Sequence, residues 1–243
     1  ESLGMRARAE EVLAPLRARA VSTPRVLADK LGEERVEPAS ITKLMAAYVI
    51  YEAIREGKMK LDDQVLISEN AWRTEGSRMF ADVNSRVPAE ALLMGMVIQS
   101  GNDATVALAE HIAGSESTFV DLMNKWAKQL GMTKSHFMNA TGLPHPDHYT
   151  TPHDIAILTR ALIHDFPEQY AHYSVKEYTF NNITQHNRNR LLWDQSLQVD
   201  GIKTGHVSQV GYNLVSSATN NEGMRLIAVV MGANSEASRA AES

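Results

Sequence analysis

The chain of 243 residues contains no cysteine, which excludes disulfide bonds, thiolate metal ligands and a cysteine nucleophile. It also lacks any apolar run near the roughly 18 residues of a membrane-spanning helix, and no hydrophobic signal-peptide segment opens it. An exported protein would therefore correspond to this sequence only in mature or trimmed form. An excess of basic residues is missing too. The formal net charge of −5 gives no reason to expect nucleic-acid binding.

What the chain does contain is typical of a soluble globular protein, with 44% hydrophobic and 22% charged residues. Periodicity predicts helices in the middle of the chain and strands near both ends. The predicted helices are 5–20 (interrupted at Pro15), 41–54, 87–99, 103–114, 117–130 and 154–165. The predicted strands are 25–30, 61–68, 178–183, 201–204, 211–219 and 224–232. This order indicates an α+β fold, with a sheet assembled from both chain ends and a helical lobe inserted between them.

One candidate for chemistry is the pair Ser40 and Lys43, three residues apart at the start of a predicted helix. Side chains at this spacing share a helix face and can meet. A serine hydroxyl becomes a good nucleophile when a base takes its proton, and a lysine can act as that base once its pKa falls toward neutrality. By itself the pair also fits a capping serine beside a solvated lysine.

Two tripeptides add to this pair. Ser100-Gly101-Asn102 lies between two predicted helices, where a hydroxyl and an amide can project from one tight turn. Lys203-Thr204-Gly205 lies at the end of a predicted strand, and Gly205 permits close approach to the backbone. Taken singly, the first also fits a helix-ending turn and the second an ordinary strand end.

Together the three motifs resemble those of the serine-type, low-molecular-mass penicillin-binding D-alanyl-D-alanine carboxypeptidases. The resemblance runs from about residue 26 to the C-terminus and extends to the residues around the motifs. The similar segments are Glu37–Lys43, Gln99–Ala104, Asn187–Asn189, Asp200–His206 and Gly211–Val215. It implies a β-lactamase/transpeptidase-like fold with an antiparallel sheet. One catalytic domain would then cover 1–243, with a sheet-plus-helix part at about 1–60 and 178–243 and a helical lobe at about 61–177.

The resemblance also implies roles for individual residues. Ser40 would attack the carbonyl between two terminal D-alanines and form an acyl-enzyme. Lys43 would act as the base, and Ser100 would relay the proton to the leaving amine. The implied substrate-binding residues are Asn102 (substrate amide), Lys203 (positive potential), Thr204 (terminal carboxylate), Gly205 (close approach), His206 (backbone N–H, with that of Ser40, as oxyanion hole) and Arg188 (carboxylate region). Arg188 fits an exposed hairpin arginine equally well.

The implied partners are the peptidoglycan pentapeptide and β-lactam antibiotics. Nothing in the sequence requires a metal or an organic cofactor. The resemblance implies a periplasmic or extracytoplasmic location, with a membrane anchor in the full-length protein. The family's C-terminal β domain and anchoring tail are absent here, and Ser235–Ser243 is similar to a shortened start of its last core helix. The predicted helix at 5–20 could take that helix's place, as expected for an engineered or rearranged chain.

Three other functions remain open. A class A β-lactamase would need a glutamate for deacylation, and the sequence has no E-x-x-L-N motif. A metallo-hydrolase is suggested by His145, His148 and His153, although these lie in a proline-rich loop that is poorly suited to rigid ligand geometry. The third is a module that is acylated by β-lactams without turning over peptide. Measurement of D-alanine release distinguishes this module from an enzyme.

Overall fold

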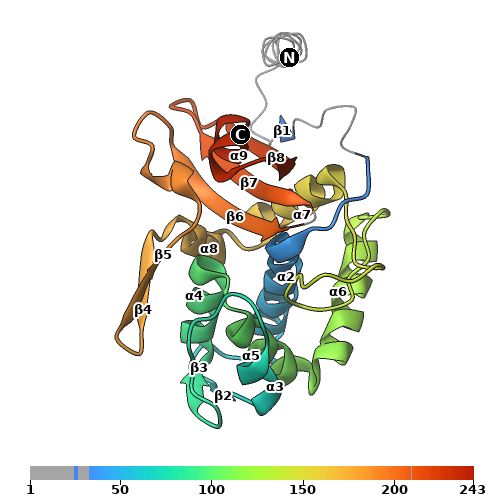
Figure 1. Cartoon of the computed structure of the whole chain (residues 1–243), viewed down its shortest axis with the longest axis vertical. Helices are drawn as coiled ribbons and strands as arrows, with labels where there is room; N and C mark the ends of the chain where they lie inside the picture. Colours follow the sequence, from blue (N-terminus) through green and yellow to red (C-terminus); the bar gives the residue numbers. More distant parts are fainter. Residues whose placement is uncertain (1–24, 27–32, 209) are drawn as a thin grey trace.

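The computed structural model describes residues 25–26, 33–208 and 210–243 (Figure 1). The predicted helix at 5–20 lies outside these residues, as does most of the predicted strand at 25–30. The α-helices are α2 (Thr42–Arg55), α3 (Glu69–Arg73), α4 (Ala89–Gln99), α5 (Asn102–Ala113), α6 (Glu116–Leu130), α7 (Pro152–Asp165), α8 (Pro167–Tyr170) and α9 (Glu236–Ala241). The 3-10 helices are η1 (Ala39–Ile41), η2 (Ala171–Ser174) and η3 (Arg190–Trp193).

A four-stranded sheet forms the upper layer in Figure 1, with the strand order β1-β8-β7-β6. Its strands are β1 (Arg25–Val26), β6 (Val199–Val207), β7 (Gly211–Thr219) and β8 (Arg225–Ala233). The three long strands are antiparallel, whereas the two-residue β1 lies parallel to β8. The predicted α+β class and the sheet joining both ends of the chain are therefore confirmed.

Helix α2 lies in the middle of the molecule, where it contacts α5, α6 and α7. Its side chains are apolar on almost every face, and Leu44, Met45 and Tyr48 are all buried. A helix that is hydrophobic all round has to be surrounded by other elements. Helix α7 packs against β8, and α9 packs against β7 and β8. The buried α2 therefore gives a fixed support to the 3-10 turn η1 at its N-terminal end.

The predicted strand at 178–183 is correct for residues 178–180, but the prediction missed the turn that follows and the second strand of a hairpin. Strands β4 (Glu177–Phe180) and β5 (Ile183–His186) pair antiparallel across a two-residue turn. The turn residues Asn181 and Asn182 have φ of 48° and 59°. Asparagine tolerates this left-handed conformation better than most residues, and tight hairpin turns require it. A second antiparallel pair joins β2 (Gln64–Leu66) to β3 (Arg86–Pro88). Strand β2 lies within the predicted strand at 61–68, whereas β3 was not predicted as a strand and overlaps the start of the predicted helix at 87–99.

Candidate active site

The predicted nucleophile Ser40 lies in the 3-10 turn η1, held between two glycines from distant segments. A Cβ atom on Gly142 would overlap the carbonyl oxygen of Ala39. A Cβ on Gly205 would lie 3.1 Å from the carbonyl oxygen of Pro38 and 3.2 Å from the backbone nitrogen of Ser40. At position 142 only a residue without a side chain allows this approach, whereas a side chain at position 205 would require the turn to shift slightly. Ala39 itself has φ of 49°, a strained conformation of the kind found at functional sites.

Lys43 is buried beneath this turn, and its Nζ lies 3.1 Å from Ser40 Oγ. Nζ also donates a hydrogen bond of 2.7 Å to the carbonyl oxygen of Thr141. Burial, followed by the positive charge of Arg188, lowers the pKa of Lys43 to about 7. A large share of the amine is therefore neutral near neutral pH and can accept a proton from Ser40.

The carbonyl of Thr141 is positioned by a turn that Asn139 organises. Asn139 Oδ1 accepts hydrogen bonds from the backbone N–H of Gly142 at 2.7 Å and of Leu143 at 3.1 Å. Its Nδ2 donates to the carbonyl oxygen of Leu143 at 2.9 Å. One side chain thus fixes both the acceptor of Lys43 and the glycine that lies against Ala39.

A second buried lysine lies beside Ser100. Lys203 Nζ donates to Ser100 Oγ at 3.0 Å and to the carbonyl oxygen of Thr204 at 2.9 Å. Burial and the positive charge of Lys43 hold the pKa of Lys203 well below its usual value. Because Lys203 donates to Ser100 Oγ, the hydroxyl proton of Ser100 is free to point elsewhere.

Asn102 follows Ser100 at the start of α5, and its side chain is buried. Its Nδ2 donates to the carbonyl oxygen of Glu75, which fixes the orientation of the amide. Its Oδ1 is buried and has no hydrogen-bond partner among the residues that the structure describes. A buried polar atom of this kind is expected to find a partner, so Oδ1 is suited to accept an N–H from a ligand.

A cavity of about 360 Å³ opens beside Ser40 and contains most of the predicted residues. The predicted residues that line it are Ser40, Ser100, Arg188, Thr204, Gly205 and His206. Lys43 and Lys203 meet the cavity through their hydrogen bonds to the two serines. Arg188 extends across the cavity, and its Nη1 donates to Ser77 Oγ at 2.8 Å. The His206 ring packs against Tyr212, with ring centroids 4.2 Å apart.

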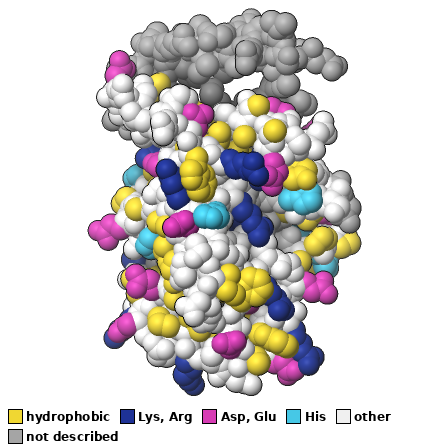
Figure 2. Space-filling view, turned by 60° about the vertical axis from the view of Figure 1, so that its left-hand side comes forward, with side chains coloured by type: hydrophobic (Ala, Val, Ile, Leu, Met, Phe, Trp, Pro, Cys, Tyr) yellow, Lys and Arg dark blue, Asp and Glu magenta, His cyan; other side chains and the backbone are white. Residues whose placement is uncertain are grey.

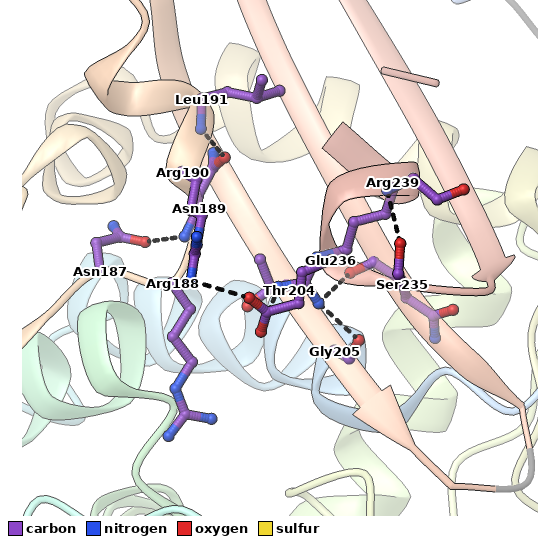
Figure 3. A network of polar contacts seen from close by, with 12 residues as sticks. Asn187, Arg188, Asn189, Arg190, Leu191, Thr204, Gly205, Ser235, Glu236 and Arg239 are labelled. Atoms are coloured by element: carbon purple, nitrogen blue, oxygen red, sulfur yellow. Dashed lines mark hydrogen bonds and ion pairs between the residues drawn. The ribbon is translucent and has the colours of Figure 1, made fainter. Parts of the chain in front are cut away.

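Four lining residues were missed by the sequence motifs: Ser77, Tyr212, Glu236 and Arg239. Arg239 is buried in α9, where its Nη1 donates to the carbonyl oxygens of Gly205 at 3.4 Å and Asn213 at 3.5 Å (Figure 3). Its guanidinium also lies over the ring of Tyr212. The sequence did not predict this position of Arg239. The segment Ser235–Ser243 was similar only to the shortened start of a helix, and nothing in it indicated that Arg239 would be buried beside β6.

The predicted histidine group does not come together. His148 is buried, its Nδ1 accepts from the backbone N–H of Met138 at 3.2 Å, and its Nε2 lies 2.8 Å from Thr42 Oγ1. With Nδ1 accepting, the neutral ring carries its proton on Nε2 and donates it to Thr42. Among residues 33–208 and 210–243, no three His, Cys, Asp or Glu side chains are grouped as metal ligands.

The chain is similar over most of its length to proteins of one family. The profile of D-alanyl-D-alanine carboxypeptidases (Peptidase_S11) matches residues 19–235. D-alanyl-D-alanine carboxypeptidase DacA of Haemophilus influenzae is 48% identical over 214 residues, covering 87% of this chain and 54% of that protein. DacC of Escherichia coli is 47% identical over 225 residues, covering 90% of this chain and 56% of that protein.

Solved structures agree with the sequence comparison. Penicillin binding protein 5 from Haemophilus influenzae superposes with a TM-score of 0.87 at 47% identity, covering 89% of this chain and 64% of that chain. Penicillin-Binding Protein D2 from Listeria monocytogenes, in its ampicillin-bound form, gives 0.79 at 26% identity, covering 88% and 87%. The fold is that of the penicillin-binding proteins.

Within that class, the chain belongs to the D-alanyl-D-alanine carboxypeptidase family. The chain spans about half the length of these curated relatives, 54% of DacA and 56% of DacC. No helix in the part of the chain that the structure describes is both long and apolar enough to cross a membrane.

Proposed function

We propose that this chain carries the catalytic site of a serine-type D-alanyl-D-alanine carboxypeptidase. It would remove the terminal D-alanine from peptidoglycan stem peptides and be acylated by β-lactams. The observation that carries the proposal is the buried Lys43 amine, with a pKa of about 7, lying 3.1 Å from Ser40 Oγ. Since its substrate is cell-wall peptide, we place the enzyme outside the cytoplasm, in association with the inner membrane.

In the acylation step, neutral Lys43 takes the hydroxyl proton of Ser40, and Oγ attacks the carbonyl carbon between the two D-alanines. The negative charge that develops on the carbonyl oxygen is stabilised by the backbone N–H groups of Ser40 and His206. Ser100, whose oxygen accepts a hydrogen bond from Lys203, relays the proton: it gives its own proton to the leaving amine and is reprotonated by the Lys43 ammonium, which returns to the neutral amine. Free D-alanine departs, and water then hydrolyses the acyl ester at Ser40.

Substrate selection rests on Thr204 and Arg188, which line the cavity, and on Asn102, which lies two residues after the lining residue Ser100. Asn102 Oδ1, which lacks a hydrogen-bond partner among the described residues, accepts a hydrogen bond from an amide N–H of the substrate peptide. Thr204 donates its hydroxyl to the terminal carboxylate, and Arg188 adds a positive charge on that side. A free C-terminal carboxylate therefore distinguishes the substrate from an internal peptide bond.

The test is steady-state release of D-alanine from diacetyl-L-lysyl-D-alanyl-D-alanine, compared with the same peptide as its C-terminal amide. We expect many turnovers on the acid and at least about tenfold lower kcat/KM on the amide, because a hydrogen bond to a charged group is lost. Acylation by penicillin without D-alanine release would instead identify a penicillin-binding module. Equal rates on acid and amide would contradict the role of Thr204 and Arg188.

A further inference from the structure

A second cavity, of about 330 Å³, lies next to the catalytic one and shares Arg188 and Glu236 with it. Its remaining lining residues are His186, Asn187, Arg190 and Trp193. Hydrolysis of a terminal D-alanine uses none of these four residues. Figure 2 turns this side of the molecule forward, and basic, acidic and histidine side chains gather in the upper half of that face.

The wall of this cavity is a rigid turn rather than a mobile loop. Asn187 and Asn189 are both buried; Asn187 Nδ2 donates to the carbonyl oxygen of Val175 at 3.0 Å, and Asn189 Nδ2 donates to that of Gly201 at 2.9 Å. The alternate residues Arg188 and Arg190 are exposed. The turn thus presents two guanidinium groups outward from buried anchors.

The side chains of Arg188 and Arg190 contact different partners in the two adjoining cavities (Figure 3). Arg188 reaches across the catalytic cavity to Ser77, whereas Arg190 Nη2 pairs with Glu236 at 3.3 Å. The side chains of Arg190 and Glu236 are 79% and 47% exposed. Exposed ion pairs contribute little to stability, so Arg190 can exchange Glu236 for a carboxylate of a ligand.

The position of the turn along β6 fixes which end of a substrate faces the second cavity. Asn189 is anchored at Gly201, near the start of the strand. His206, whose backbone N–H belongs to the proposed oxyanion hole, lies near its end. Thr204 and Arg188, which read the carboxylate of the leaving residue, lie on the Gly201 side of that N–H. The second cavity therefore continues from the leaving-group side of the scissile bond.

We propose that the second cavity is a subsite for the side chain of the leaving residue. It accepts D-amino acids whose long side chain ends in a carboxylate, with Arg190 binding that carboxylate and the half-exposed ring of Trp193 contacting the methylenes. The lining of the cavity itself fits an anion, since it carries two arginines, Arg188 and Arg190, against one carboxylate, Glu236. Just outside this lining, Lys176 lies near the Trp193 ring, and Glu177 pairs with His186 at 3.4 Å. This inference rests on the proposed carboxypeptidase function.

The test uses peptides diacetyl-L-lysyl-D-alanyl-D-X, in which X is alanine, 2-aminoadipate, norleucine or aspartate. 2-Aminoadipate and norleucine have side chains of similar length and differ in charge, whereas aspartate carries the charge on a short side chain. We expect kcat/KM for 2-aminoadipate to exceed that for norleucine and aspartate by about tenfold, as for one charged hydrogen bond gained. Arg190→Gln should remove this preference and leave release of D-alanine unchanged.

Two further variants sharpen the result. Glu236→Gln removes the competing carboxylate, so it should increase the preference for 2-aminoadipate over norleucine. Arg160→Gln, at an exposed arginine of α7 that lines neither cavity, should change nothing. The subsite is refuted if D-alanine is released normally but the three larger residues are cleaved equally, or if Arg190→Gln keeps the preference. If D-alanine itself is not released, the proposed function fails and the subsite fails with it.

Discussion

Lys43 is an unusual residue for a protein interior, because it is an almost fully buried amine to which no carboxylate of the described residues is bound. Its neighbours are a hydroxyl and a backbone carbonyl, which suit a neutral amine as well as a charged one. The spacing of Ser40 and Lys43 predicted their contact. It could not predict the depressed pKa, because burial and the charge of Arg188 come from segments far along the chain.

Replacing Lys43 by arginine keeps a positive charge and removes the base. Arginine cannot lose its proton in the working range, so acylation of Ser40 should fall by at least about a hundredfold. The measurement is the rate of acylation by a fluorescent penicillin under single-turnover conditions. Near-normal acylation by Lys43→Arg would rule Lys43 out as the base.

The pH profile tests the same residue without replacing it. Acylation needs neutral Lys43, so its rate should rise with pH and level off above about 7, the pKa of this lysine. Arg188→Gln removes a positive charge that favours the neutral amine, so the pKa of Lys43 and the acid limb should both move to higher pH. An acid limb that stays in place in Arg188→Gln would contradict this electrostatic coupling.

Among the elements, the turn η1 depends most on parts distant in sequence, because Gly142 and Gly205 lie against it from two sides. A methyl group on Gly142 would push the carbonyl of Ala39 and move Ser40 away from Lys43. We expect Gly142→Ala to reduce acylation by about a hundredfold, the loss typical of a displacement of about 1 Å.

Gly131→Ala is the matched control for this prediction. Gly131 has φ of 85°, close to the 89° of Gly142, but a Cβ there meets nothing within 4 Å. Both variants share the cost of a left-handed alanine, about 1–2 kcal/mol of folding free energy. Only Gly142→Ala should lose acylation. A similar loss in both variants would indicate general destabilisation rather than displacement of the turn.

The elements that periodicity predicted best are the long apolar helices and the strand at 211–219, which coincides with β7. In these segments local pattern and tertiary environment favour the same structure. The hairpin at 177–186 was only half predicted, because its strands are short and two asparagines supply the turn. Strand β3 follows a long irregular segment and is defined by its pairing with β2 rather than by its own sequence.

For the whole molecule, the candidate site could be predicted only in part. The three motifs supplied Ser40, Ser100 and Lys203, and the resemblance to a family placed them together. The remaining residues of the site reach it through packing between segments that are distant in sequence. Arg239 reaches the site because α9 lies on the sheet, and Thr141 reaches Lys43 because an asparagine-stabilised turn crosses the N-terminal end of α2. No local pattern encodes these contacts.

A buried histidine links α2 to the segment 136–150 and should make the stability of the whole molecule depend on pH. Burial lowers the pKa of His148 to about 4 from its ordinary 6.5. Between these values the unfolded chain binds a proton that the folded chain does not. The free energy of unfolding should therefore fall by about 3 kcal/mol as the pH drops from 6.5 to 4.

Chemical denaturation at several pH values measures this effect. His148→Gln should flatten the pH dependence over that interval, whatever its effect on absolute stability. His164→Gln, at a histidine whose side chain is 84% exposed, is the control and should leave the slope unchanged. A slope that persists in His148→Gln would show that other groups cause it.

The central claim is that Ser40 is the residue acylated at this site, and mass spectrometry of the intact protein after incubation with benzylpenicillin tests it most directly. The chain has no cysteine that could react in place of the serine. We predict one adduct of the mass of benzylpenicillin, located on the peptide that contains Ser40, and no adduct on Ser40→Ala. An adduct that persists in Ser40→Ala, or a folded parent protein that forms none, would contradict the account.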